Sequence, residues 1–542
     1  MVRHFRQIIV WPIQLMPLRP NEQVQRHWEA LERIEAENPW KELVDEFGAD
    51  ADCFQERHYK EFVTYLPYVQ RFLYGSTVGQ EATRKGHGEA GMRVFRRADV
   101  AQVRISYDDG ARLSFDVAHV DLYFFLDADV AVLVLEMHAN DLSLDRVQDT
   151  LFRFGRAYPA FWEGGSVAGN CPRLVEWLDA GGTVLATSDY DDCAKYRRFV
   201  HRYRSPCIAR HWEHLLRPLA LERVGEKAVL RYRQLEYYRM PFMVYLAVDD
   251  PTALTRADFV RLALVTRSGD PDTLPYSIAS LTDFEREYCE DRFWGRAGGG
   301  FSGDTRIIVS GPAFAVVGRH DDWFFAGPDT GMLGQFRHQY FLLFLIAHFN
   351  KAALVSISDE LAVAMNRLTV GDTASVKQFK RTIRQATEVF LRFTHRYYFH
   401  EVSHQALAKT VYGRLQDRLG TEKLYEEVRN EVIDMSAYLD SDSARRQANT
   451  IVRLTVVTIF GLIGTVVSGL LGMNLLSESH RPLAERVLIF LVFTAAVCAL
   501  TVATIVRSKR LADFLDSLSD ERVSWRSKGR ILLDAFKSAK PA

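Results

Sequence analysis

The chain has 542 residues, of which 48% are hydrophobic and 25% are charged, and its formal net charge is −1. This length exceeds that of one ordinary domain, so we expect two or more folded domains. The near-zero charge gives no support for a nucleic-acid partner, because proteins that bind nucleic acids usually carry an excess of basic residues.

Residues 1–325 mix strand and helix patterns, which predicts an α/β domain. The apolar run 8–11 indicates a first strand that ends at Pro12, since proline cannot donate a hydrogen bond to a neighbouring strand. Two alternating runs, 103–107 and 111–115, flank the turn dipeptide Asp109-Gly110 and predict a hairpin with a two-residue loop.

Further along this domain, apolar runs at 120–126 and 130–135 indicate two buried strands joined by a tight turn. A helix pattern begins after Asn140-Asp141 and continues through Leu151. The glycine-rich segment Gly295–Gly303 lacks the Gly-Lys-Ser/Thr ending of a phosphate-binding loop, so we interpret it as a flexible loop.

The cysteines are scattered and form no Cys-x-x-Cys pair, which indicates reduced thiols of a cytosolic domain. One of them, Cys498, lies instead in an apolar run. The others are Cys53, Cys171, Cys193, Cys207 and Cys289.

Residues 326–450 predict a helical bundle and a long stalk helix. Tyr340–Phe349 is strongly apolar, but about ten residues are too few to cross a bilayer, which takes about twenty, so we expect a buried core helix. No glycine or proline interrupts Thr421–Phe460, so one helix could continue from the soluble part into a membrane. Two helices should each bury one apolar face, formed by Phe379, Ile383, Ala386, Phe390, Phe393 and Tyr397 in the first and by Leu424, Val428, Val432, Met435 and Leu439 in the second.

Residues 451–507 predict a transmembrane hairpin with spans at about 451–476 and 486–507, followed by a tail at 508–542. Leu454–Ser477 and Val487–Val506 carry no charge, and each is long enough for a ~30 Å hydrocarbon core. Basic residues flank both spans on the outer sides of the hairpin. The positive-inside rule therefore predicts a multi-pass protein of the cell (inner) membrane, with both termini and the large N-terminal part in the cytoplasm.

The first span presents two stripes at helical spacing. One is apolar with two hydroxyl groups, and its residues are Ile451, Leu454, Thr458, Leu462, Thr465 and Gly469. The other consists of small residues, Gly464, Ser468 and Gly472, which would let a neighbouring helix approach closely. The two threonine hydroxyls have an alternative role, because they can bond back to carbonyl groups of their own helix.

The segment Thr465–Asn474 resembles the end of the first membrane helix in the CorA-type magnesium transporters, a two-span family marked by Gly-x-Asn, here Gly472-Met473-Asn474. The threonine nine residues before the asparagine and the glycine five residues before it also match. The resemblance is specific over about Thr421–Arg510. It departs at Leu471, where the family usually has an aromatic residue, and in the outer loop Ser477–Glu485, which lacks the usual Met-Pro-Glu-like segment.

This resemblance implies a homopentamer with a funnel of cytoplasmic domains and a pore lined by the first span. It places Asn474 in a ring at the outer mouth that receives the hydrated ion, with Gly472 and Met473 shaping that turn and Thr465 in the upper pore. Leu462, Leu454 and Ile451 would form apolar constrictions. The transported ion would be Mg²⁺ or another divalent cation, with no further cofactor, and cytosolic metal could act as a regulator at Asp434, Asp440 and Asp442.

Other functions fit parts of the sequence. His400-Glu401-Val402-Ser403-His404 matches His-Glu-x-x-His, which on a helix could hold zinc for a metallopeptidase. A membrane-tethered sensor or interaction protein that kept the hairpin without transport is a further possibility. Zinc rather than magnesium as the cargo is a variant of the main hypothesis, in which the chain is a transporter and not an enzyme.

Overall fold

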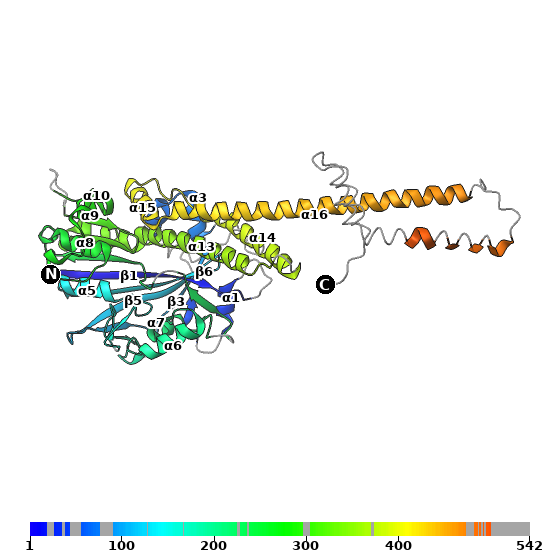
Figure 1. Cartoon of the computed structure of the whole chain (residues 1–542). Coiled ribbons are helices and arrows are strands. Elements are labelled where there is room, and N and C mark those ends of the chain that lie inside the picture. The colour runs from blue at the N-terminus through cyan, green and yellow to red at the C-terminus, as the bar shows by residue number, and fades with distance from the viewer. Residues whose placement is uncertain are drawn as a thin grey trace. The chain divides into compact units, whose positions relative to one another are not determined.

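The computed structural model describes residues 1–18, 26–34, 38–43, 56–75, 90–126, 128–165, 167–224, 228–235, 238–295, 304–369, 373–472, 482–485, 487–488, 491–492 and 495–499. Contacts within the chain divide it into two compact units, Met1–Val432 and Ile433–Ala542. The first unit contains the strands and most of the helices (Figure 1).

The centre of the first unit is one large mixed sheet, which has 14 strands in the described part of the chain. The strands are β1 (Val2–Leu15), β2 (Trp40–Glu42), β3 (Met92–Arg97), β4 (Gln102–Ser106), β5 (Arg112–Phe125), β6 (Val130–Leu142), β9 (Leu174–Leu178), β10 (Val184–Thr187), β11 (Ala220–Leu221), β12 (Arg231–Gln234), β13 (Phe242–Val248), β14 (Cys289–Glu290), β15 (Arg306–Val309) and β16 (Ala313–Arg319). The main path runs β10-β9-β4-β5-β6-β1-β13-β16-β15-β14. Along this path only β13 and β16 pair in parallel. A separate two-stranded sheet pairs β7 (Trp162–Glu163) with β8 (Val167–Ala168).

The expectation that the first strand ends at Pro12 is wrong, because β1 continues to Leu15. On one side β1 pairs with β6 along nearly its whole length. On the other side the pairing with β13 stops at Ile9 and that with β12 begins at Ile13. The amide of Val10 donates toward Pro241 on this second side, so the missing amide of Pro12 also faces the break between the two partner strands. No ladder hydrogen bond is lost there.

Helices cover both faces of this sheet (Figure 1). Figure 1 shows α13 with α14 and α15 on one side and α6 with α7 on the other. The helices of the first unit are α1 (His27–Glu32), α2 (Glu56–Thr64), α3 (Pro67–Tyr74), α5 (Leu144–Arg153), α6 (Cys193–Tyr203), α7 (Arg210–Leu216), α8 (Arg256–Leu264), α9 (Ile278–Thr282), α10 (Phe284–Tyr288), α11 (Trp323–Ala326), α12 (Met332–Gln335), α13 (Phe341–Asn366), α14 (Thr373–Arg396) and α15 (Ala406–Leu419), with a π-helical turn at Phe336–Tyr340; α16 (Thr421–Gly472) begins there and extends into the second unit.

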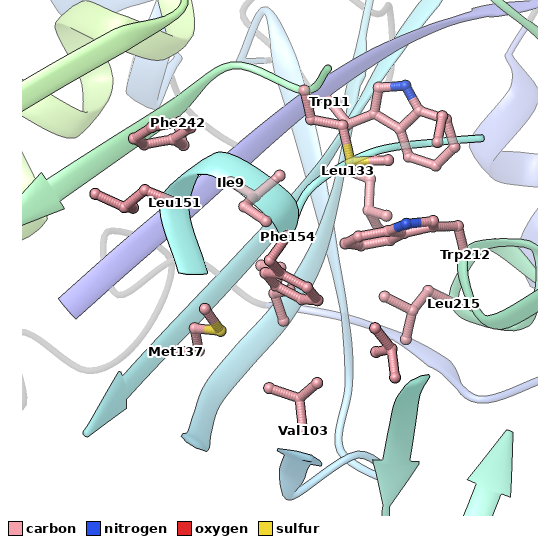
Figure 2. Packing of buried hydrophobic residues seen from close by; sticks show 14 of the residues in the cluster. Ile9, Trp11, Val103, Leu133, Met137, Leu151, Phe154, Trp212, Leu215 and Phe242 are labelled. Atoms are coloured by element: carbon pink, nitrogen blue, oxygen red, sulfur yellow. The ribbon is translucent and has the colours of Figure 1, made fainter. Parts of the chain in front are cut away.

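A hydrophobic core cluster lies on one face of the sheet (Figure 2). The Trp11 and Trp212 rings meet edge to face at 6.1 Å, and the Phe154 ring lies 5.4 Å from that of Trp212. Ile9 and Leu133 reach the same cluster from β1 and β6. Aromatic side chains therefore supply much of the surface that holds α5 and α7 against the sheet.

The opposite face is covered by α13, a buried core helix as predicted. The Phe349 ring stacks on Phe125 of β5 with 3.8 Å between centroids. With α12 and the π-helical turn, this helix runs Met332–Asn366, and it is the one helix among the described residues that is long and apolar enough to cross a membrane. Its 18-residue apolar window is 83% buried inside the protein, as in a core helix.

Several other expectations are confirmed. The strands β4 and β5 form the predicted hairpin. The predicted two-residue loop is wrong, because the amide of Tyr107 donates to the carbonyl of Ala111 and the loop between them is longer. Helix α5 begins after Ser143, whose hydroxyl accepts from the amide of Arg146. Both predicted apolar faces are covered, as shown by Ile383 of α14 at 0% exposure and Val428 of α16 at 1%. The described cysteines are free thiols, whereas Cys53 and most of Gly295–Gly303 lie outside the described residues.

A buried ion network joins the helical layer to the sheet. Glu136 of β6 is 2% exposed and pairs with Arg6 of β1. Its carboxylate oxygens also lie 2.6 Å from Nε2 of His119 and 2.9 Å from Nε of Arg337 on the π-helical turn. Nδ1 of His119 lies 3.1 Å from the carboxylate of Asp121. A buried charge needs such partners, because an isolated one would be strongly destabilising.

This arrangement shifts the acid–base equilibria of its members. Burial alone would lower the pKa of His119, but its bonds to Asp121 and Glu136 outweigh burial and raise that pKa to about 9. Burial alone would raise the pKa of Glu136, but pairing with His119, Arg337 and Arg6 holds it well below its ordinary value. Both side chains are therefore charged at neutral pH.

We expect the His119→Gln substitution to lower the free energy of unfolding by roughly 2–3 kcal/mol near pH 6. Because the pKa of His119 is raised in the folded state, its contribution is complete below the unfolded value of ~6.5 and is lost as the pH rises through about 9. Urea unfolding of both proteins at pH 6, 8 and 10 should show this difference shrinking. The matched control is His201→Gln on the exposed side of α6, and an equal His119 effect at pH 6 and pH 10 would contradict the expectation.

Candidate functional site

The candidate ion pathway lies on α16, a single helix of 52 residues from Thr421 to Gly472. At a rise of ~1.5 Å per residue this helix is about 78 Å long. Its first turns belong to the first unit and the rest to the second unit. The prediction of one uninterrupted helix through Phe460 is therefore confirmed.

Aromatic stacking fixes the base of α16 within the first unit. The Tyr425 ring stacks on Tyr398, which precedes α15, with 4.3 Å between centroids and an interplanar angle of 8°. The same ring lies 5.5 Å from Phe390 of α14. The hydroxyl of Ser358 on α13 donates to Glu431 at 3.2 Å. Three neighbouring elements thus hold the start of this helix.

The predicted pore stripe is exposed along its entire length in the second unit. Its residues Ile451, Leu454, Thr458, Leu462, Thr465 and Gly469 are all exposed. At ~100° per residue they fall within roughly 80° of one another around the helix. The side chains of Leu454 and Leu462 are 67% and 66% exposed, which is unusual for large apolar residues in contact with water.

The opposite side of the same helix is the covered one. Val456 is 1% exposed and Gly464 is buried, while Val452, Val457 and Phe460 are partly buried. These residues span about 140° of the helix surface and are centred roughly opposite the exposed stripe, with Val456 and Phe460 nearest to the opposite side. The helix therefore has one packed face and one open face.

The packed face meets the second apolar segment at a glycine. A Cβ atom added to Gly464 would lie 2.9 Å from Cγ1 of Val497, closer than ordinary contact allows. Only a residue without a side chain permits this approach. Residues 487–488, 491–492 and 495–499 of the second segment are helical where they are described.

The threonine hydroxyls on α16 bond back to their own helix, as the alternative interpretation held. Thr458 donates to the carbonyl of Leu454 at 2.8 Å, and Thr465 donates to that of Gly461 at 2.9 Å. A hydroxyl that donates in this way keeps its oxygen lone pairs, so it can still accept a hydrogen bond from water.

The structure does not extend to the whole predicted pore mouth. Gly472 is the last residue of α16, while Met473, Asn474 and most of the outer loop lie outside the described residues. Asp434 and Asp440 are exposed on α16, and the side chain of Asp442 is not described. Among the described residues no group of three His, Cys, Asp or Glu side chains is positioned to hold a metal ion.

The His-Glu-x-x-His segment is not helical, so the two histidines do not share a helical face as the metallopeptidase alternative requires. It lies in the connection between α14, which ends at Arg396, and α15, which begins at Ala406. Val402 accepts from the amide of Leu66, and the Ser403 hydroxyl donates to the carbonyl of Thr64, which holds the segment extended. Glu401 pairs with Lys409, and this hydrogen bond lowers the pKa of Glu401.

Sequence reasoning predicted that Gly464 would let a neighbouring helix approach, as it does at Val497, but it missed the packed face around Val456. The small-residue stripe that includes Gly464 was the available signal, but nothing in the sequence identified its partner. It also missed the ion network at Glu136, whose partner Arg337 lies 201 residues away.

No match to this chain is found among protein-family models, curated proteins or solved structures. The resemblance to the CorA-type family therefore rests on the segment around Gly472 and on the order of the predicted elements.

We expect Gly464→Ala to weaken the packing of the two apolar segments, because the new methyl group would lie too close to Val497. The matched control is Gly461→Ala on the same helix, where an added Cβ meets nothing within 4 Å and the higher helix propensity of alanine is worth up to ~1 kcal/mol. The measurement is the temperature at which half of the purified protein stays monodisperse in detergent. It should fall for Gly464→Ala and hold or rise for Gly461→Ala; equal changes would contradict the expected packing.

Proposed function

We propose that the chain transports a divalent metal cation, Mg²⁺ or a relative such as Co²⁺, Ni²⁺ or Zn²⁺, across the cell membrane through a pore lined by α16. The observation that carries this proposal is the open face of α16, where Ile451 to Gly469 form an exposed stripe opposite a packed face. A helix with this division can meet a second span on one side and an ion path on the other.

Several exposed apolar side chains favour a membrane environment for the second unit. Ile451 and Ile459 of α16 are 58% and 48% exposed, and Val492 of the following segment is 61% exposed. Leaving such groups in water forfeits about 1.5–3 kcal/mol for each side chain that could be fully buried. Lipid and neighbouring copies of the chain would cover them.

Two helices cannot enclose an aqueous path, so the proposal requires several copies around a common axis. The resemblance to the CorA-type family favours five. In such an assembly the packed face at Val456 and Gly464 would point away from the axis and toward the second span. The multi-pass topology with both termini in the cytoplasm follows from the basic residues that flank the hairpin.

The stripe provides chemistry suited to a strongly hydrated cation. Mg²⁺ loses its water reluctantly and usually keeps several water molecules when bound. The hydroxyl oxygens of Thr458 and Thr465 can accept hydrogen bonds from that water while donating to their own helix. The leucine side chains of all copies would form one apolar constriction at Leu454 and another at Leu462, which would close the path by excluding water. A divalent ion gains about 4.6 kcal/mol across ~100 mV, so inward flow needs no nucleotide.

The first test is ion uptake by liposomes that contain the purified protein, using Mg²⁺, Co²⁺, Ni²⁺ and Zn²⁺ in turn. We expect uptake, and we expect Asn474→Ala to abolish it because the proposed ring of amides at the mouth is lost. The matched control is Asn366→Ala at the exposed end of α13, which should leave uptake unchanged. Absence of uptake in folded, oligomeric protein would refute transport and favour a membrane-tethered sensor.

A second test separates the two faces of α16. Leu462→Ser places a hydroxyl in a proposed constriction, so we expect a higher basal ion leak at rest because the narrow region becomes wet. Val456→Ser makes the same kind of change on the packed face, and we expect no rise in leak there. Equal leaks in the two variants would show that the exposed stripe of α16 does not line the pore.

A further inference from the structure

A cavity of about 290 Å³, lined mostly by polar residues, lies in the first unit. It opens between α2, the segment from Asp329 to Gln339 and Gln405, which precedes α15. Its volume is near the lower limit of the ~300–1,000 Å³ typical of ligand sites. Such a volume suits a small molecule.

Internal hydrogen bonds hold the walls of this cavity in place. Gln335 accepts from the hydroxyl of Tyr340 at 2.8 Å. Gln405 donates from Nε2 to the Thr64 hydroxyl at 3.3 Å, and the Tyr65 hydroxyl donates to the carbonyl of Gln339 at 2.7 Å. Polar side chains that are already held in place can bind a ligand without the entropy cost of ordering those side chains first.

Only some of the charged side chains in the cavity walls have a strong partner within the protein. Glu61 accepts from the Tyr74 hydroxyl and lies 3.3 Å from Nδ1 of His338. Lys60 lies 2.9 Å from Glu56, a partner that is 80% exposed, so this pair contributes little. Asp329 takes part in no ion pair within the described chain. Lys60 and Asp329 thus line one cavity with opposite charges and do not pair with each other.

We infer that this cavity binds a small zwitterion, an α-amino acid with a short polar side chain. Its carboxylate would pair with Lys60 and its ammonium group with Asp329. The amides of Gln335, Gln339 and Gln405 offer both donors and acceptors to the remaining polar atoms. Val63 is the one hydrophobic residue of the lining.

One wall of the cavity belongs to the π-helical turn, which forms an ion pair with the sheet. His338 is in the cavity wall, and its neighbour Arg337 on the same π-helical turn reaches the buried Glu136. Such turns occur frequently at functional sites. This inference goes beyond ion transport and does not depend on it.

The test is isothermal titration calorimetry on the full-length protein in detergent, with each common free amino acid in turn. Sodium acetate and methylammonium chloride serve as half-ligands that carry only one of the two charges. We expect at least one polar amino acid to bind. Each half-ligand should bind at least ~10-fold more weakly, because a charge-assisted hydrogen bond is worth about 1.5–3 kcal/mol and 1.4 kcal/mol is tenfold.

The decisive variants are Lys60→Gln and Asp329→Asn, each expected to weaken binding by about tenfold or more. Their matched controls are Lys423→Gln, which removes a lysine from another exposed ion pair four residues apart, and Asp272→Asn on an exposed turn. Both controls should keep the affinity. No binding of any amino acid would overturn the inference, and so would an effect of only one of the two decisive variants, which indicates a simple anion or cation site.

Discussion

The unbroken backbone hydrogen bonding of α16 is the constraint on which the proposed pathway depends. In a bilayer every amide and carbonyl group must be satisfied within the segment that spans it. The helix meets this requirement from Thr421 to Gly472 although it contains several glycines, because none of them interrupts its hydrogen bonds. Its regular geometry also keeps Ile451 and Gly469 on one side over several turns. A kink would move the constrictions and the hydroxyl groups onto different faces.

In the first unit, a helical layer packs against a sheet that contains buried charges. Most of the contact is apolar and includes the stacked rings of Phe125 and Phe349. In the middle of β6, an interior strand, the sheet carries Glu136, which would be costly to bury alone. Arg337 arrives on the π-helical turn and supplies a partner from the helical layer. The same turn forms part of the polar cavity, so one short element serves both the stability of the layer and the wall of the cavity.

The sequence predicts those parts of the fold that depend on local periodicity. The buried faces of α14 and α16, the hairpin at Gly110 and the core helix at Phe349 all follow from spacing and turn residues. It fails where distant partners decide. The strand β1 passes Pro12 because two other strands separate at that point. The segment around Glu401 is extended because Thr64 and Leu66 hold it, more than 300 residues earlier in the chain.

The candidate site is likewise predicted by the sequence only where local spacing decides. The sequence identifies the stripe from Ile451 to Gly469, and its helical spacing makes the shared exposure in the structure understandable. The packed face depends on Val497, which belongs to another segment and gives no local signal next to Gly464. Met473 and Asn474 lie outside the described residues, so the mouth remains a prediction from sequence.

The aromatic stack at the base of α16 makes this helix a lever arm. Between Tyr425 and Gly472 the helix measures about 70 Å at ~1.5 Å per residue. A tilt of about 5° at the Tyr398–Tyr425 stack would displace Gly472 by roughly 6 Å over that length. A small rearrangement of two flat rings would therefore become, at the far end, a movement as large as one turn of a helix.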